Sequence, residues 1–164
     1  VPEWDEDEAG PALSVDVVKK LKAEIEGNTA YADHVFSLEP ERHQKLSDVF
    51  RNCGFLFETL FVPASAELIA KHCPEADKAR AILTAVSETC VGHAASETWD
   101  PAMRKIAADN GVKDKVVFML SRVAITGQEK TPPLFEIMHM LGDARVKERL
   151  NGAIARAGTS VAAA

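Results

Sequence analysis

Apolar residues recur at intervals of three and four along almost the whole chain, and strand-like alternation of apolar and polar residues is nearly absent. The clearest series runs through Leu46, Val49, Phe50, Cys53 and Phe57, which places one apolar stripe on a helix over residues 45–61. A β-sheet needs several segments with a period of two, and no segment of this chain is long enough to supply one. The pattern therefore predicts an all-α fold.

The same spacing predicts further helices, whose ends are marked by capping residues, glycine and proline. Ser14 is placed to cap the first of them. They are expected over residues 15–27, 30–36, 66–72, 77–91, 98–110, 113–125, 134–141 and 143–157. Residues 61–65, with Pro63 at their centre, interrupt the pattern. We therefore expect two small helical subdomains, residues 1–62 and 63–157, with an acidic tail at residues 1–13 and a flexible tail at residues 158–164.

Charge is divided unevenly along the chain. The net charge of −6 taken as an average argues against nucleic acid as a partner, because phosphate binding relies on lysine and arginine. Residues 1–101 carry 9 basic and 19 acidic side chains, whereas residues 102–164 carry 10 basic and 6 acidic ones. A basic region therefore exists within the second subdomain, and its main members are Arg104, Lys105, Lys113, Lys115, Lys130, Arg145, Lys147 and Arg149.

The cysteines do not indicate a disulfide framework or a metal site. Cys53, Cys73 and Cys90 are odd in number and widely spaced, and neither a C-x-x-C nor an H-x-x-x-H pair occurs. We expect buried, structural thiols and no bound metal.

Targeting signals and catalytic motifs are also missing from the sequence. The chain has no run of about 20 apolar residues, and its first residues lack the basic and apolar regions of a signal peptide. A cytoplasmic location is therefore expected. None of the patterns G-x-x-x-x-G-K-[ST], G-x-G-x-x-G and G-x-S-x-G occurs, so this chain is not expected to catalyse a reaction by itself.

Residues 122–136 form the most informative segment, in which a helix end, a glycine turn, a proline-stiffened loop and a new helix start follow one another. Thr131 is placed to cap the second helix, with Pro132 or Pro133 in its first turn. Free backbone N–H groups at such a helix start can receive a phosphate or a base. A rigid connection between two helices that binds no ligand fits the same residues.

Two motifs resemble bacterial-type glutamyl-tRNA synthetases, which are class I aminoacyl-tRNA synthetases. Residues 122–136, followed by residues 141–150, resemble the pattern L-R-V-A-x-T-G-x-x-x-[ST]-P-x-L-F-E and then L-G-[KR]-E-R-x-x-x-R-L at the carboxy-terminal end of that family. Ser121 stands in place of the first leucine, and Asp143 and Ala144 in place of [KR]-E. Residues 42–48 resemble the family's R-x-[RK]-T-L-x-[ED] segment, with Gln44 in place of its basic residue, and residues 98–112 its W-T-E…K-G-V stretch.

The resemblance implies an anticodon-binding region built as an α-helix cage. By position in the motifs, Thr131, Pro132 and Leu134 are expected to read the anticodon, and Arg42 to contact its third base. The catalytic motifs of the family, similar to H-I-G-H and K-M-S-K-S, are absent from this sequence. Aminoacylation with ATP and magnesium is therefore expected of a parent enzyme, of which this chain is an excised fragment or a free-standing relative.

The resulting hypothesis is an anticodon-recognition domain for tRNA(Glu) that acts as a monomer, without DNA or membrane partners. The similar cage of class I lysyl-tRNA synthetase is an alternative, because residues 127–130 fit its G-Q-E-[KR] loop while residues 131–135 depart from it. A helical protein–protein adaptor derived from a synthetase is a second alternative. Whether the parent enzyme serves only tRNA(Glu) or also tRNA(Gln) stays open.

Overall fold

The computed structural model describes residues 14–38, 46–89 and 99–158, and every regular element within these ranges is a helix. The prediction of an all-α fold is therefore confirmed. The chain is divided into two compact units, Val1–Val62 and Pro63–Ala164. Among the described residues, no helix combines the length and the apolar character that crossing a bilayer requires. The acidic segment 1–13, residues 159–164, Arg42 and Cys90 lie outside the described residues.

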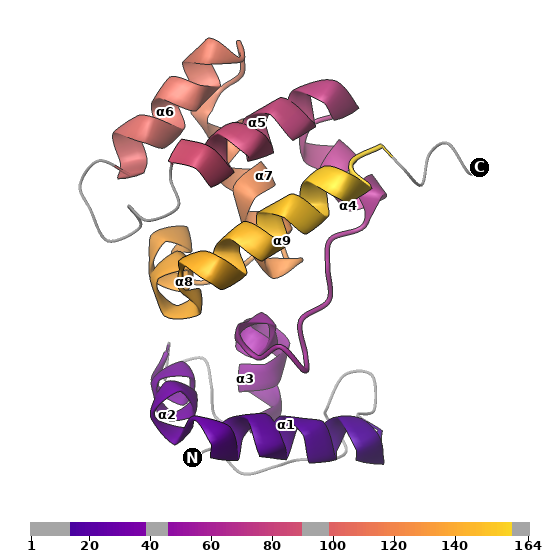
Figure 1. Cartoon of the computed structure of the whole chain (residues 1–164), viewed down its shortest axis with the longest axis vertical. Helices are drawn as coiled ribbons and strands as arrows, with labels where there is room; N and C mark the ends of the chain where they lie inside the picture. Colours follow the sequence, from indigo (N-terminus) through magenta and orange to yellow (C-terminus); the bar gives the residue numbers. More distant parts are fainter. Residues whose placement is uncertain (1–13, 39–45, 90–98, 159–164) are drawn as a thin grey trace. The chain divides into compact units, whose positions relative to one another are not determined.

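The described residues of the first unit form three α-helices and a 3-10 helix (Figure 1). The α-helices are α1 (Val15–Gly27), α2 (Thr29–Ser37) and α3 (Leu46–Cys53), and the 3-10 helix is η1 (Gly54–Leu56). Ser14 caps α1 as predicted, since its Oγ accepts a hydrogen bond from the Val17 amide at 3.2 Å. Phe57 packs against Phe36 and Phe50, with ring centroids 6.1 Å apart in both pairs.

The prediction of one continuous helix over residues 45–61 is wrong, because α3 ends at Cys53. A longer α-helix would direct the amide groups of Glu58 and Thr59 to carbonyls within the same helix. In the structure, these amides donate to the Glu24 carboxylate of α1 at 2.7 and 2.9 Å. The low helix propensity of Gly54 also favours an end at this point. Contacts with α1 therefore override the apolar periodicity.

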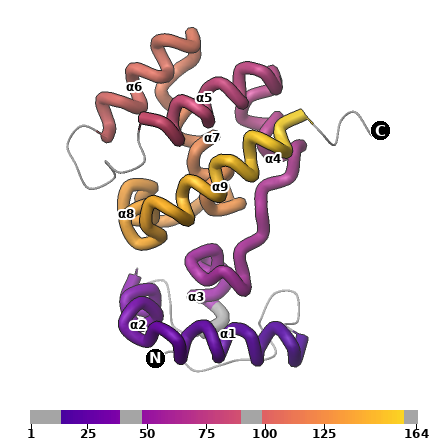
Figure 2. The backbone as a smooth tube through the Cα atoms, in the orientation of Figure 1, coloured from indigo at the N-terminus to yellow at the C-terminus, as the bar shows by residue number. Residues whose placement is uncertain are grey.

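Within its described residues, the second unit contains six α-helices, of which five are arranged around α7 (Figures 1 and 2). α7 packs against every other helix of the unit, and α9 runs along α5. Apolar residues of α7 such as Val117, Leu120 and Ile125 are fully buried. The helices are α4 (Ala66–His72), α5 (Ala76–Thr89), α6 (Trp99–Asp109), α7 (Asp114–Thr126), α8 (Leu134–Leu141) and α9 (Asp143–Arg156).

The two cysteines within the described residues are free and buried, as expected for structural thiols. Cys53 is fully buried and Cys73 is 4% exposed. Burial raises the pKa of the Cys73 thiol, which lowers its reactivity. In the same part of the chain, no three His, Cys, Asp or Glu side chains are grouped so as to hold a metal ion.

Candidate nucleic-acid interface

Residues 127–133 connect the buried helix α7 to α8, and we call them the α7–α8 loop. Its first residue, Gly127, has a φ of 74°, and its amide donates to the Val123 carbonyl at 2.8 Å. The hydroxyl of Thr126 accepts a hydrogen bond from the Gln128 amide at 3.0 Å and lies 2.8 Å from the Arg122 carbonyl, to which it donates. These bonds fix the direction in which the chain leaves α7.

The prediction that Thr131 caps α8 is wrong. Pro133 occupies the cap position, and the Thr131 hydroxyl donates to the Pro132 carbonyl at 2.8 Å. A residue before proline avoids the helical conformation, so two successive prolines keep both Thr131 and Pro132 extended. The helix can therefore start no earlier than Pro133; in the structure Pro133 is the cap residue, so neither proline lies in the first turn.

The start of α8 has no side-chain cap in the described structure. The bond from the Ile137 amide to the Pro133 carbonyl, at 3.1 Å, is the first of the helical ladder. The amides of Leu134, Phe135 and Glu136 precede that bond, so they have no carbonyl partner within the helix. They form a group of donors beside the α7–α8 loop.

The residues expected to read the anticodon differ in exposure. Thr131 is half-buried, whereas Pro132 is buried and Leu134 is 3% exposed. The structure thus brings these three residues together in the loop and the first turn of α8. Arg42, the fourth expected contact, lies outside the described residues.

Phe135 is an exposed aromatic residue in the first turn of α8 that was not among the residues predicted to read the anticodon. It is 45% exposed although its ring centroid lies 6.3 Å from that of Trp99. Trp99 is itself held by Phe118, at 5.5 Å between centroids, and by Met138, whose Sδ lies 3.3 Å from the indole nitrogen. The sequence already indicated that Phe135 is exposed, because Phe135 falls outside the apolar stripe of α8, which consists of Leu134, Ile137, Met138 and Leu141.

The basic side chains of the second unit fall into two groups. Arg149 is 4% exposed and donates to the Ile125 carbonyl at 2.9 Å, so it stabilises the core. Arg104 and Lys105 form ion pairs with aspartates of α6, and Arg104 also pairs with Asp114 of α7. Four further exposed lysines are better placed to meet a polyanion, namely Lys113, Lys115, Lys130 and Lys147.

An uncapped helix start, an exposed aromatic ring and exposed lysines are features that RNA-binding domains use to bind single-stranded loops. The family model described as "Anticodon binding domain" matches residues 12–154. The chain therefore belongs to the anticodon-binding domain family, and the resemblance found in its motifs is confirmed.

The curated relatives are glutamate–tRNA ligases. The chain is 43% identical over 128 residues to the glutamate–tRNA ligase of Gloeobacter violaceus. This alignment covers 78% of the present chain and 24% of the Gloeobacter protein. It is 31% identical over 130 residues to the glutamate–tRNA ligase of Dehalococcoides mccartyi strain 195, and this alignment covers 79% of the present chain and 27% of that protein. The chain thus spans about a quarter of the length of these relatives.

A solved structure shares the fold. It is the glutamate tRNA ligase from Elizabethkingia meningosepticum in complex with its amino acid, with a TM-score of 0.59 and 20% sequence identity. The match covers 85% of this chain and 28% of the solved chain.

Proposed function

We propose that this chain is the anticodon-recognition region of a glutamate–tRNA ligase and that it binds the anticodon loop of tRNA(Glu). The observation that carries the proposal is the family match over residues 12–154, together with the glutamate–tRNA ligases among the relatives. The geometry of the α7–α8 loop and of α8 supports it.

Recognition of an unpaired base needs polar groups for its edge and a flat surface for its face. Thr131 and the amides of the first turn of α8, which have no carbonyl partner within the helix, supply the polar groups. Phe135 supplies an exposed ring beside them. Pro132 and Leu134 are buried, so we propose that they form the apolar floor of the loop and shape the space that a base enters.

Arg42 is proposed to contact the third anticodon base. The forked donors of a guanidinium can bind two acceptors on one base edge, which a lysine cannot do with the same geometry.

The longer protein is proposed to attach glutamate to tRNA, with ATP and magnesium held by residues outside this chain. We further propose that it works in the cytoplasm as a monomer, without DNA or membrane partners.

A binding titration tests this function. The chain is titrated against tRNA(Glu), against the same tRNA with one anticodon base changed, and against tRNA(Lys). We expect salt-sensitive binding that is weakened by about 1–3 kcal/mol when a recognised base is changed. Equal affinity for all three RNAs would contradict anticodon recognition, and tighter binding of tRNA(Lys) would support a lysine enzyme instead.

A further inference from the structure

The side chain of Glu129, near the middle of the α7–α8 loop, binds the end of α4. Both of its carboxylate oxygens lie 2.9 Å from the Lys71 ammonium nitrogen, and Oε2 also lies 3.0 Å from Nε2 of His72. The partners are 58 and 57 residues apart in sequence from Glu129. The contact therefore connects the loop to a separate element of the second unit.

α4 is held in place by its packing within the second unit, so it can position a residue that binds to it. Its residues Ala66 and Ile69 are buried, and the helix packs against α7, the central helix of the unit. The His72 side chain is 15% exposed, whereas those of Lys71 and Glu129 are 61% and 37% exposed. One of the two partners of Glu129 is thus largely fixed by its surroundings.

The position of Glu129 matters because of its neighbours in sequence. The bonds of Thr126 and Gly127 fix where the loop leaves α7, and Pro133 fixes where α8 starts. Glu129 lies between these two points, two residues before Thr131. Exposed ion pairs usually change global stability little, so the effect of this contact is expected in the local geometry of the loop.

We propose that Glu129 is a positioning residue of the anticodon-reading loop, which it holds against Lys71 and His72 in the conformation that receives the RNA. This inference rests on the proposed function and adds a residue that would act without touching the anticodon. A loop that is ordered before binding loses less conformational entropy when the RNA binds.

The direction in which Glu129→Ala changes RNA affinity distinguishes a positioning role from a purely electrostatic one. A carboxylate near a polyanion repels it, so its removal should strengthen RNA binding if charge were its whole contribution. Loss of a positioning contact has the opposite effect. Glu129→Ala should therefore weaken binding although it removes a negative charge.

The experiment measures the affinity of the full chain for an RNA hairpin that carries the anticodon stem and loop of tRNA(Glu). A second hairpin has its central anticodon base changed. We expect Glu129→Ala to weaken binding of the first hairpin roughly tenfold and to leave the second nearly unchanged, because the ordered loop contributes only to recognition. Glu129→Gln should retain part of the affinity, since its amide oxygen can still accept from Lys71.

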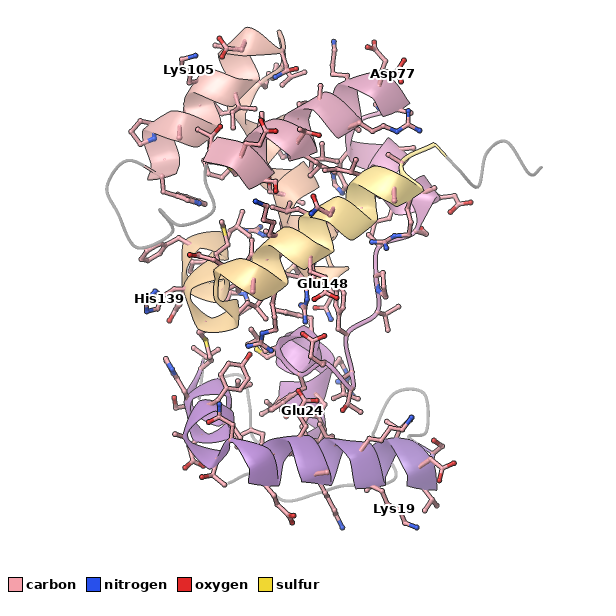
Figure 3. The ribbon with its side chains drawn as sticks, in the orientation of Figure 1. Lys19, Glu24, Asp77, Lys105, His139 and Glu148 are labelled. Carbon is pink, nitrogen blue, oxygen red and sulfur yellow. The ribbon has the colours of Figure 1, made fainter. Side chains whose placement is uncertain are left out.

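Glu148→Ala is the matched control, because it also removes an exposed carboxylate from the second unit, on α9 (Figure 3). It should bind the first hairpin as tightly as the unmodified chain or more tightly. Lys71→Met should reproduce the loss seen in Glu129→Ala, and should add little to it in the double variant.

The outcomes separate the inference from the function on which it rests. If the unmodified chain does not distinguish the two hairpins, the proposed function is wrong. If it does distinguish them and Glu129→Ala binds equally well or better, Glu129 is not a positioning residue. An equal loss for both hairpins with a lowered melting temperature would assign Glu129 a general structural role and overturn the inference.

Discussion

Glu24 stabilises the first unit through a single carboxylate with three donors. Besides the amides of Glu58 and Thr59, the Thr59 hydroxyl donates to its Oε1 at 2.7 Å. Glu24 points from α1 toward this turn, whereas Lys19 points away from it (Figure 3). Glu24→Ala leaves all three donors without this acceptor and should lower the free energy of unfolding by about 1–3 kcal/mol.

Urea unfolding followed by circular dichroism measures this loss. Glu26→Ala is the control, since Glu26 lies on the same helix and is exposed. It removes the same charge and should change stability by less than about 0.5 kcal/mol. Similar losses for the two variants would mean that helix charge, and not the turn contact, is responsible.

The carboxyl group of Glu129 should titrate below its ordinary pKa of 4.5. The Lys71 hydrogen bond is the main cause of the lowered pKa, and the charges of Lys71 and His72 act in the same direction. A lowered pKa in the folded state stabilises the fold above about pH 4.5, and this contribution is lost as the pH falls through the folded-state value. An NMR titration of the Glu129 carboxyl carbon should show this, and Lys71→Met should raise the pKa.

Arg42→Ala tests the base contact proposed for this residue. It should weaken binding of tRNA(Glu) by about 1–3 kcal/mol if the guanidinium binds the third anticodon base. The loss should vanish when that base is changed. A loss that is the same for every third base would instead indicate a contact with the RNA backbone.

At the scale of elements, the sequence predicted helix caps and buried faces correctly where contacts between residues close in sequence determine them. Ser14 caps α1, and the buried stripe of α8 is formed by Leu134, Ile137, Met138 and Leu141. The errors concern contacts between distant elements or successive prolines. The end of α3 depends on Glu24, and the start of α8 on Pro133, which excludes the cap expected of Thr131.

Gly127 ends α7 in the left-handed region, with a φ of 74°. A side chain in this conformation costs roughly 1–2 kcal/mol, so Gly127→Ala should lower stability by about that amount. It should also weaken RNA binding, because the α7–α8 loop starts at this residue.

Gly27→Ala is the matched control for this element. Gly27 is the last residue of α1, where an added Cβ meets no atom within 4 Å and φ is not positive. The substitution should raise stability by up to about 1 kcal/mol, through the better helix propensity of alanine. Thermal unfolding should therefore shift in opposite directions for the two variants, and shifts of the same sign would contradict the role assigned to the backbone of Gly127.

For the molecule as a whole, the motifs predicted the family, but the structure was needed to sort the residues of the site. Residues 131–135 identified the loop, yet sequence alone could not show that Pro132 and Leu134 are buried while Phe135 is exposed. Charge counting found the basic region but could not separate the buried Arg149 from an exposed Lys130. Burial depends on tertiary packing, and the counts contain no such information.

The uneven distribution of charge leads to a final prediction, which concerns the salt dependence of RNA binding by the full chain. Lys130→Glu and Lys19→Glu change the net charge equally, and both lysines are exposed, in the α7–α8 loop and on α1 respectively. If RNA phosphates lie beside the loop, Lys130→Glu should weaken binding of tRNA(Glu) and lower the slope of log affinity against log salt by roughly 1. Lys19→Glu should leave that slope nearly unchanged. Affinities measured over a series of salt concentrations test this, and equal effects of the two variants would show that the RNA responds to net charge and not to a basic surface around the loop.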